Sequence, residues 1–226
     1  MKWVLENLPY LADSAWAHLQ LSIPPIILSF VLSVPLGWLA NRYRLFRGPL
    51  LTVAGLLYAI PSLPLLIVLS VVVGLGLRSP VNVVIALTLY GMALMVRSTA
   101  DALDAVEPDV RQSATAMGFS GLGRFFSVDF PLAGPVLLAG MRVVVVSTVS
   151  LVTVGGVLGI NGLGLLFTDG LQRGIIAEIV AGIVLTVALA LILDGLLVLL
   201  GRLLMPWSRA TAAPTRRAAR RMMATA

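Results

Sequence analysis

The sequence contains no cysteine and only one histidine among its 226 residues. Disulfide bonds and thiolate-bound metals are therefore excluded, and the redox state of the compartment cannot be inferred. The few carboxylates are scattered without the spacing of metal ligands, so we expect no metal site. We also identify no catalytic residue, and "GFSGLG" at 118–123 lacks the Gly-Lys-Ser/Thr ending of a phosphate-binding loop.

Charge is scarce as well. Only 12% of the residues are charged and 59% are hydrophobic, whereas soluble domains carry roughly 25% charged residues. The alternating pattern of membrane β-strands is missing. We therefore expect an all-α integral membrane protein of about five transmembrane helices, without a separate soluble domain. The apolar segments that predict the spans are 17–41, 49–75, 79–97, 133–158 and 175–204.

The N-terminal stretch does not have the pattern of a signal peptide, because Glu6 and Asp13 interrupt it and no small-residue cleavage site follows. We expect the first span to remain in the mature protein. The predicted organisation is an extracytoplasmic N-terminus (1–16), a transmembrane domain (17–205) and a basic cytoplasmic tail (206–226).

Arginine and lysine are distributed unevenly between the two sides that five spans would create. Arg142 lies within a span, and Lys2, Arg78 and Arg173 fall on one side. By the positive-inside rule the richer side is cytoplasmic, which places the N-terminus outside and the C-terminus inside the cell membrane. We expect the tail to touch anionic lipid headgroups rather than nucleic acid. The twelve residues on the richer side are Arg42, Arg44, Arg47, Arg97, Arg111, Arg124, Arg202, Arg209, Arg216, Arg217, Arg220 and Arg221.

Two regions carry residues that disturb a regular helix. Pro61 and Pro64 should each kink or break the second span, either as a packing feature or as a bend that lines a transport pathway. Pro24, Pro25 and Pro35 raise the same question in the first span. The glycine-rich segment 155–174 also contains many apolar residues, which favours a packed loop or short re-entrant helix over a flexible linker.

The predicted cytoplasmic loop, residues 98–132, is the least membrane-like part of the chain. Its sequence predicts two short helices. Pro108 suits the start of the first, and Gly118 suits a left-handed position after its end. Ser120 is a plausible N-cap for the second, and Pro131 is expected to end it. Exposed apolar side chains on such a module need something to bury them, either the protein itself, the bilayer surface or a docked partner.

At these residues the chain resembles the permease subunits of ABC importers. Those proteins carry Glu-Ala-Ala, three residues, Gly, nine residues, then Ile-x-Leu-Pro. This chain has the same spacing, with replacements that include glutamine for glutamate, serine for alanine and phenylalanine for leucine. The matching residues are Gln112, Ser113, Ala114, Gly118, Val128, Phe130 and Pro131.

The resemblance covers roughly residues 15–205 and is most similar to the glycine betaine/carnitine/choline branch. "YAIPSLPLL" at 58–66 and the segment 139–171 resemble that branch. The resemblance implies a type I importer permease fold and a coupling loop that docks on an ATP-binding subunit. It also implies two ATP-binding subunits, a second permease subunit (identical or related) and an external binding protein, with ATP and Mg²⁺ bound by the partner. Methionine importer permeases have a similar size and loop.

The resemblance also suggests a substrate path near Tyr58, Pro61, Ser62 and Pro64. Few aromatic residues lie in the spans, so a tight trimethylammonium cage is not expected there. A secondary transporter is the alternative from another class, and it would need ionisable residues inside the membrane. Arg142 and Asp194 are the clear examples, and they could equally be helix-end anchors or a mutual structural pair.

Overall fold

The computed structural model describes residues 2–209, which form a bundle of helices with no strand in that range. The predicted basic tail therefore lies almost entirely outside the described residues. The elements, in chain order, are α1 (Lys2–Glu6), α2 (Leu8–Arg42), α3 (Arg44–Ala59), α4 (Ser62–Val73), α5 (Pro80–Asp104), α6 (Pro108–Ala116), α7 (Gly121–Arg124), the π-helical η1 (Phe125–Asp129), α8 (Phe130–Val152), the 3₁₀-helical η2 (Thr153–Leu158), α9 (Leu163–Arg173), α10 (Ile176–Leu204) and the 3₁₀-helical η3 (Pro206–Arg209).

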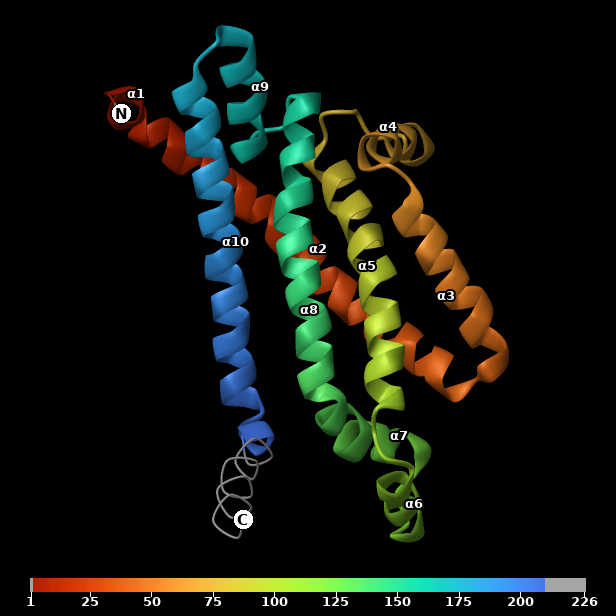
Figure 1. Cartoon of the computed structure of the whole chain (residues 1–226). Coiled ribbons are helices and arrows are strands. Elements are labelled where there is room, and N and C mark those ends of the chain that lie inside the picture. Colours follow the sequence, from red (N-terminus) through yellow and green to blue (C-terminus); the bar gives the residue numbers. More distant parts are fainter. Residues whose placement is uncertain (1, 210–226) are drawn as a thin grey trace, which may run out of the picture.

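The bundle has two distinct ends (Figure 1). At one end lie α6 and α7 together with the end of α10, and we call it the loop end. At the other lie α1, α4 and α9, and we call it the hairpin end. The long helices α5, α8 and α10 run between the two ends, while α2 crosses them obliquely. Within residues 2–209, four helical stretches are long and apolar enough to span a membrane, or five if the bent pair α3–α4 counts as one span. This confirms the predicted all-α membrane fold.

The second predicted span is not a single helix. α3 ends at Ala59, and α4 departs from its direction by 106°. The break follows from Pro61, whose ring pushes the preceding residue out of the helical region, and Ile60 has φ −68° and ψ 128°. α3 alone has 16 residues, about 24 Å of helix at 1.5 Å per residue, which is less than the ~30 Å hydrocarbon core.

The prediction of a kink or break was right for Pro61 and wrong for Pro64. Pro64 is the third residue of α4, where its missing N–H would have no intrahelical partner anyway. The prolines of the first span also leave the helix intact, because α2 continues through Pro24, Pro25 and Pro35.

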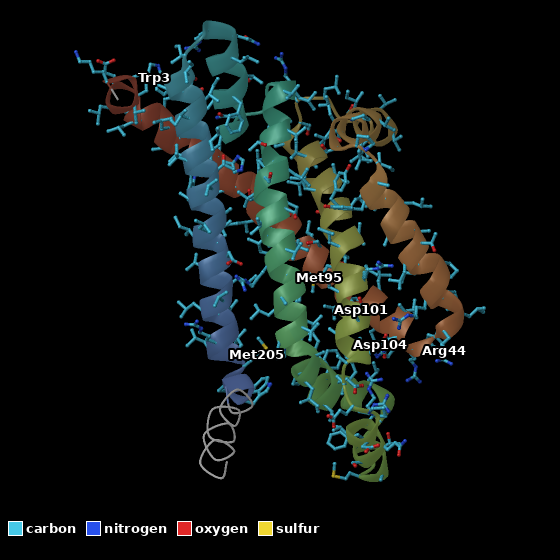
Figure 2. The ribbon with its side chains drawn as sticks, in the orientation of Figure 1. Trp3, Arg44, Met95, Asp101, Asp104 and Met205 are labelled. Atoms are coloured by element: carbon cyan, nitrogen blue, oxygen red, sulfur yellow. The ribbon has the colours of Figure 1, made fainter. Side chains whose placement is uncertain are left out.

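The helix α5 is the centre of the bundle, with 61% of its most apolar stretch buried, while α10 is peripheral with none. Small residues let α2 and α8 approach α5 closely. A Cβ atom on Gly91 would lie 2.6 Å from Cβ of Ser29 in α2, and one on Gly140 of α8 would lie 2.6 Å from Cβ of Ser98. Met95, labelled in Figure 2, is fully buried in this core.

The glycine-rich segment forms a tight hairpin of η2 and α9. A Cβ atom on Gly156 would lie 2.2 Å from the carbonyl carbon of Gly164, and one on Gly164 would lie 2.1 Å from the Thr153 oxygen. Leu163 and Leu166 of α9 are fully buried. The prediction of a packed segment rather than a flexible linker is confirmed.

Candidate coupling site

The first helix of the loop has the predicted limits. α6 begins at Pro108, and Gly118 follows its end with φ +88°. The amide of Phe119 donates to the carbonyl of Ala114 (3.2 Å) and the amide of Gly118 donates to that of Thr115 (3.0 Å). This pair of bonds is a Schellman cap, which requires a left-handed residue at this position.

The second helix begins as predicted but does not end at Pro131. The Oγ atom of Ser120 accepts a hydrogen bond from the amide of Gly123 at 3.2 Å. From there α7, η1 and α8 form one continuous helical stretch. The amide of Phe130 bonds to the carbonyl of Phe125, one residue further back than in an α-helix. Pro131 is the second residue of α8, directly after this π-helical turn, and the helix continues through it.

A buried carboxylate joins the two helices of the loop. Asp129 lies 3.3 Å from Nε of Arg111 in α6 and 3.3 Å from Nε of Arg124 in α7, and its side chain is only 6% exposed. Arg111 also donates to the carbonyl of Leu103 at the end of α5, and Arg124 donates to Thr115 Oγ1 at 3.2 Å. These contacts make the loop a cross-linked unit attached to α5. We call Arg111, Arg124 and Asp129 the loop ion cluster.

The sequence interpretation did not identify this cluster. Asp129 occupies the variable position of the Ile-x-Leu-Pro pattern, and the two arginines were read only as markers of orientation. A carboxylate in the apolar sequence "FFSVDFP" was the available signal, because a buried charge needs a paired partner.

The base of the loop packs on α2 through aromatic rings. Phe125 is 5% exposed, and its ring centroid lies 5.7 Å from that of Trp38 and 5.8 Å from that of Phe130. The guanidinium of Arg42 lies 5.8 Å from the Trp38 centroid and 5.7 Å from that of Tyr43. A polar crevice of about 340 Å³ separates this group from the loop ion cluster.

A second set of polar contacts fixes the junction of α2 and α3 against α5. Arg47 Nη1 lies 2.6 Å from Asp104 Oδ2, and Asn41 Nδ2 donates to Asp104 Oδ1 at 2.5 Å. Asp101 lies 3.7 Å from Arg47 Nη2. Figure 2 shows Asp101 and Asp104 near Arg44, the first residue of α3. The first two spans are therefore held to the helix that carries the loop.

The outer face of the loop is apolar and exposed. Met117 is 71% exposed, Leu122 61% and Phe126 67%, and Phe119 is 40% exposed. The loop therefore carries exposed apolar side chains, as the sequence predicted, although Phe125 is buried. Such a cluster at the tip of a membrane protein is typical of a surface that binds another molecule.

The seven residues of the predicted coupling motif divide between surface and interior. Gln112, Ser113 and Gly118 are exposed, and Ala114 is 1% exposed. The remaining three, Val128, Phe130 and Pro131, are partly buried where the loop enters α8. The motif therefore combines surface positions with those that shape the loop.

The residues predicted for a substrate path lie at the break between α3 and α4, at the hairpin end. Tyr58 is 48% exposed, and its ring centroid lies 6.0 Å from that of Tyr90 in an edge-to-face arrangement. The Tyr90 hydroxyl donates to the carbonyl of Ile60. Pro61 and Pro64 are exposed and Ser62 is partly buried. The structure does not bring this group to the loop, which lies at the opposite end (Figure 1).

Comparison with known proteins gives a family match over most of the chain. A family model described as "Binding-protein-dependent transport system inner membrane component" matches residues 33–207. The osmoprotectant import permease protein OsmW of Salmonella typhimurium is 34% identical over 198 residues, covering 86% of this chain and 92% of OsmW. The glycine betaine/carnitine/choline transport system permease protein OpuCD of Bacillus subtilis is 30% identical over 202 residues, covering 89% of this chain and 87% of OpuCD.

The fold also matches solved structures. A chain of the MetNI methionine ABC transporter in an inward-facing conformation superposes with a TM-score of 0.77, at 20% identity, covering 88% of this chain and 98% of that chain. A second crystal form gives a TM-score of 0.70 at 22% identity, covering 86% and 94%. At this level of identity the match establishes the fold alone.

Proposed function

Because the chain belongs to the family of binding-protein-dependent transport system inner membrane components, we propose that it forms half of the translocation pore of an ATP-driven importer for small quaternary ammonium osmoprotectants. The observation that carries the family is the match over residues 33–207, and it confirms the resemblance that the loop motif suggested. The substrate class is supported by OsmW and OpuCD, whose names give osmoprotectants, glycine betaine, carnitine and choline as cargo.

The importer we propose contains two permease subunits, two ATP-binding subunits and an external binding protein. ATP and Mg²⁺ bind the ATP-binding subunits, which supply the hydrolysis. The exposed apolar tip of the loop, around Met117, Leu122 and Phe126, provides the surface on which an ATP-binding subunit docks. Burying these side chains in a groove stabilises the contact by removing apolar area from water.

Movement of the docked subunits is transmitted through a stiff connection. The loop ion cluster ties α6 to α7 and η1, so that the loop moves as one body. The continuous helix from Gly121 onward then passes this movement to α8 without a hinge. Approach of the two ATP-binding subunits would thereby rotate the bundles between inward-facing and outward-facing states.

The loop end is placed on the cytoplasmic side in this proposal. The support is the concentration of arginines at that end, including Arg42, Arg44 and Arg47 at the α2–α3 junction, together with the positive-inside rule. The hairpin end then faces the binding protein. Tyr58, Pro61, Ser62 and Pro64 lie near that entrance, where they provide a weak, transient site, while the binding protein provides tight recognition.

The experiment is uptake in cells that lack their other osmolyte importers and carry this system with its binding protein. Accumulation of labelled glycine betaine or choline, lost on deletion of the binding-protein gene, is the expected result. Uptake of methionine that excess betaine does not reduce would assign the chain to amino-acid transport instead. A matched control is the same strain with the ATP-binding subunit inactivated, which should show no accumulation.

A further inference from the structure

One ion pair lies within the membrane-spanning part of the bundle. Arg142 of α8 and Asp194 of α10 are joined by two hydrogen bonds, Nε to Oδ1 at 2.7 Å and Nη2 to Oδ2 at 2.8 Å. Arg142 is about 18 Å along the helix axis from the start of α8, and Asp194 is about 15 Å from the end of α10, at 1.5 Å per residue. This confirms a mutual pair and excludes the reading of two separate helix-end anchors.

The pair is unevenly exposed. The Asp194 side chain is 17% exposed, whereas that of Arg142 is 48% exposed. An arginine at this depth costs about 2.5–3.5 kcal/mol or more when it faces lipid, and intramembrane arginines almost always face the protein or a water-filled cavity. The open side of Arg142 therefore faces water or protein in the assembled transporter.

The guanidinium also has unused donors. It carries five N–H groups in a planar fork, and Asp194 occupies the edge formed by Nε and Nη2. The edge formed by Nη1 and Nη2 has no partner in the hydrogen bonds of the described residues. That edge has the spacing for a second bidentate contact with a carboxylate. Asp194 meanwhile fixes the orientation of the side chain, as a supporting residue does in a preorganised site.

We propose that Arg142, held by Asp194, is a transient binding site for the carboxylate of a zwitterionic osmolyte within the translocation path. The inference rests on the proposed function and adds a residue that distinguishes substrates. Glycine betaine and carnitine each carry a carboxylate that can bond to the free guanidinium edge. Choline carries the same trimethylammonium group but no carboxylate, so it cannot make this contact.

A cysteine close to Arg142 tests whether this face meets water and substrate. Ala139 lies one turn before Arg142 on α8 and is exposed, and Ile192 lies on the side of α10 turned away from Asp194 and is 57% exposed. In proteoliposomes that contain the permease with its ATP-binding subunit, Ala139→Cys should react with a water-soluble thiol reagent. Millimolar glycine betaine should slow that reaction at least about threefold, and millimolar choline should not. Ile192→Cys is the control and should remain unreactive.

An exchange of the two charges separates substrate contact from structural support. Arg142→Gln should reduce glycine betaine uptake about tenfold, the equivalent of one charge-assisted hydrogen bond. The double variant Arg142→Asp with Asp194→Arg restores an ion pair but moves the guanidinium to α10. Its membrane level and the stimulation of its ATPase by loaded binding protein should equal those of the wild type, while glycine betaine uptake stays low.

Two results would overturn the inference. Full recovery of uptake in the exchanged double variant would show a purely structural pair. Equal reactivity of Ala139→Cys with and without glycine betaine would show that the substrate does not pass this face. Wild-type protein in the same assay separates this test from that of the proposed function. Absence of wild-type uptake would contradict the proposed function. The labelling of Ala139→Cys would still show whether glycine betaine reaches Arg142.

Discussion

Arg111 of α6 and Asp129 of η1 form an ion pair across the loop, with Nε and Oδ1 3.3 Å apart. The two residues are separated by a turn that contains the left-handed Gly118, so the pair closes the loop on itself. Arg124 meets the second carboxylate oxygen of Asp129 at 3.3 Å. One buried carboxylate therefore holds both helices that the proposed docking surface requires.

Replacing Asp129 by asparagine should loosen this loop. The change removes the charge that two arginines share, each with about a quarter of its side chain exposed (24% and 27%). We expect a loss of about 1.5–3 kcal/mol in the stability of the loop, and weaker retention of the ATP-binding subunit on purification. The measurement is the amount of that subunit recovered with the permease. Unchanged recovery together with unchanged thermal unfolding would contradict the role given to the cluster.

Gly118 separates backbone strain from partner contact. A Cβ atom here would have no atom within 4 Å, so the cost of a substitution comes from φ +88° alone. Gly118→Ala should cost about 1 kcal/mol, and Gly118→Asn less, because asparagine tolerates the left-handed region. Gly118→Asp should leave the protein in the membrane but abolish ATP-driven uptake and weaken association with the ATP-binding subunit. Normal uptake by Gly118→Asp at normal membrane levels would show that this surface is not docked.

Two glycines with different surroundings, one in the hairpin and one in α10, test the packing of the hairpin. A Cβ atom on Gly164 would lie 2.1 Å from the Thr153 oxygen, whereas one on Gly195 in α10 would meet nothing within 4 Å. Gly164→Ala should lower the unfolding temperature sharply, because backbone atoms of η2 must move. Gly195→Ala should be neutral or stabilising by about 0.5–1 kcal/mol, since alanine is the better helix former. Similar unfolding temperatures for both variants would contradict the close packing of η2 on α9.

Orientation can be tested at one exposed residue from each end. Ser120 lies in the loop and Gln172 in the hairpin, and both are exposed. In intact cells an impermeant thiol reagent should label Gln172→Cys and should not label Ser120→Cys, which becomes reactive only after the membrane is opened. Labelling of Ser120→Cys in intact cells would reverse the proposed topology.

Local patterns predicted much of this structure. The apolar runs gave the membrane class and most of the helices. Pro108, Gly118 and Ser120 each occupy the predicted position, because helix ends depend on residues close in sequence. The prediction that Pro131 ends the second loop helix was wrong, because a π-helical turn precedes it and the helix continues. Local pattern does not reveal how a backbone bond can shift by one residue.

Contacts between distant residues were harder to predict. The spacing of the loop motif identified the family, but it did not show that Asp129 would meet Arg111 and Arg124. The direction of α4 was also beyond sequence pattern. Pro61 predicted a break, but the 106° angle depends on how α4 packs against α5. Arg142 and Asp194, 52 residues apart, were noted as charges within spans, while their bidentate geometry and unequal exposure came from the fold.

Reconstituted transport tests the central claim most directly. The permease is incorporated into proteoliposomes with its ATP-binding subunit, and the binding protein loaded with labelled glycine betaine is supplied on the side of the hairpin end. The account predicts accumulation that requires ATP on the side of the loop, requires the binding protein, and is lost in Gly118→Asp. Accumulation driven by an ion gradient without ATP, or ATP-dependent accumulation that Gly118→Asp leaves intact, would contradict it.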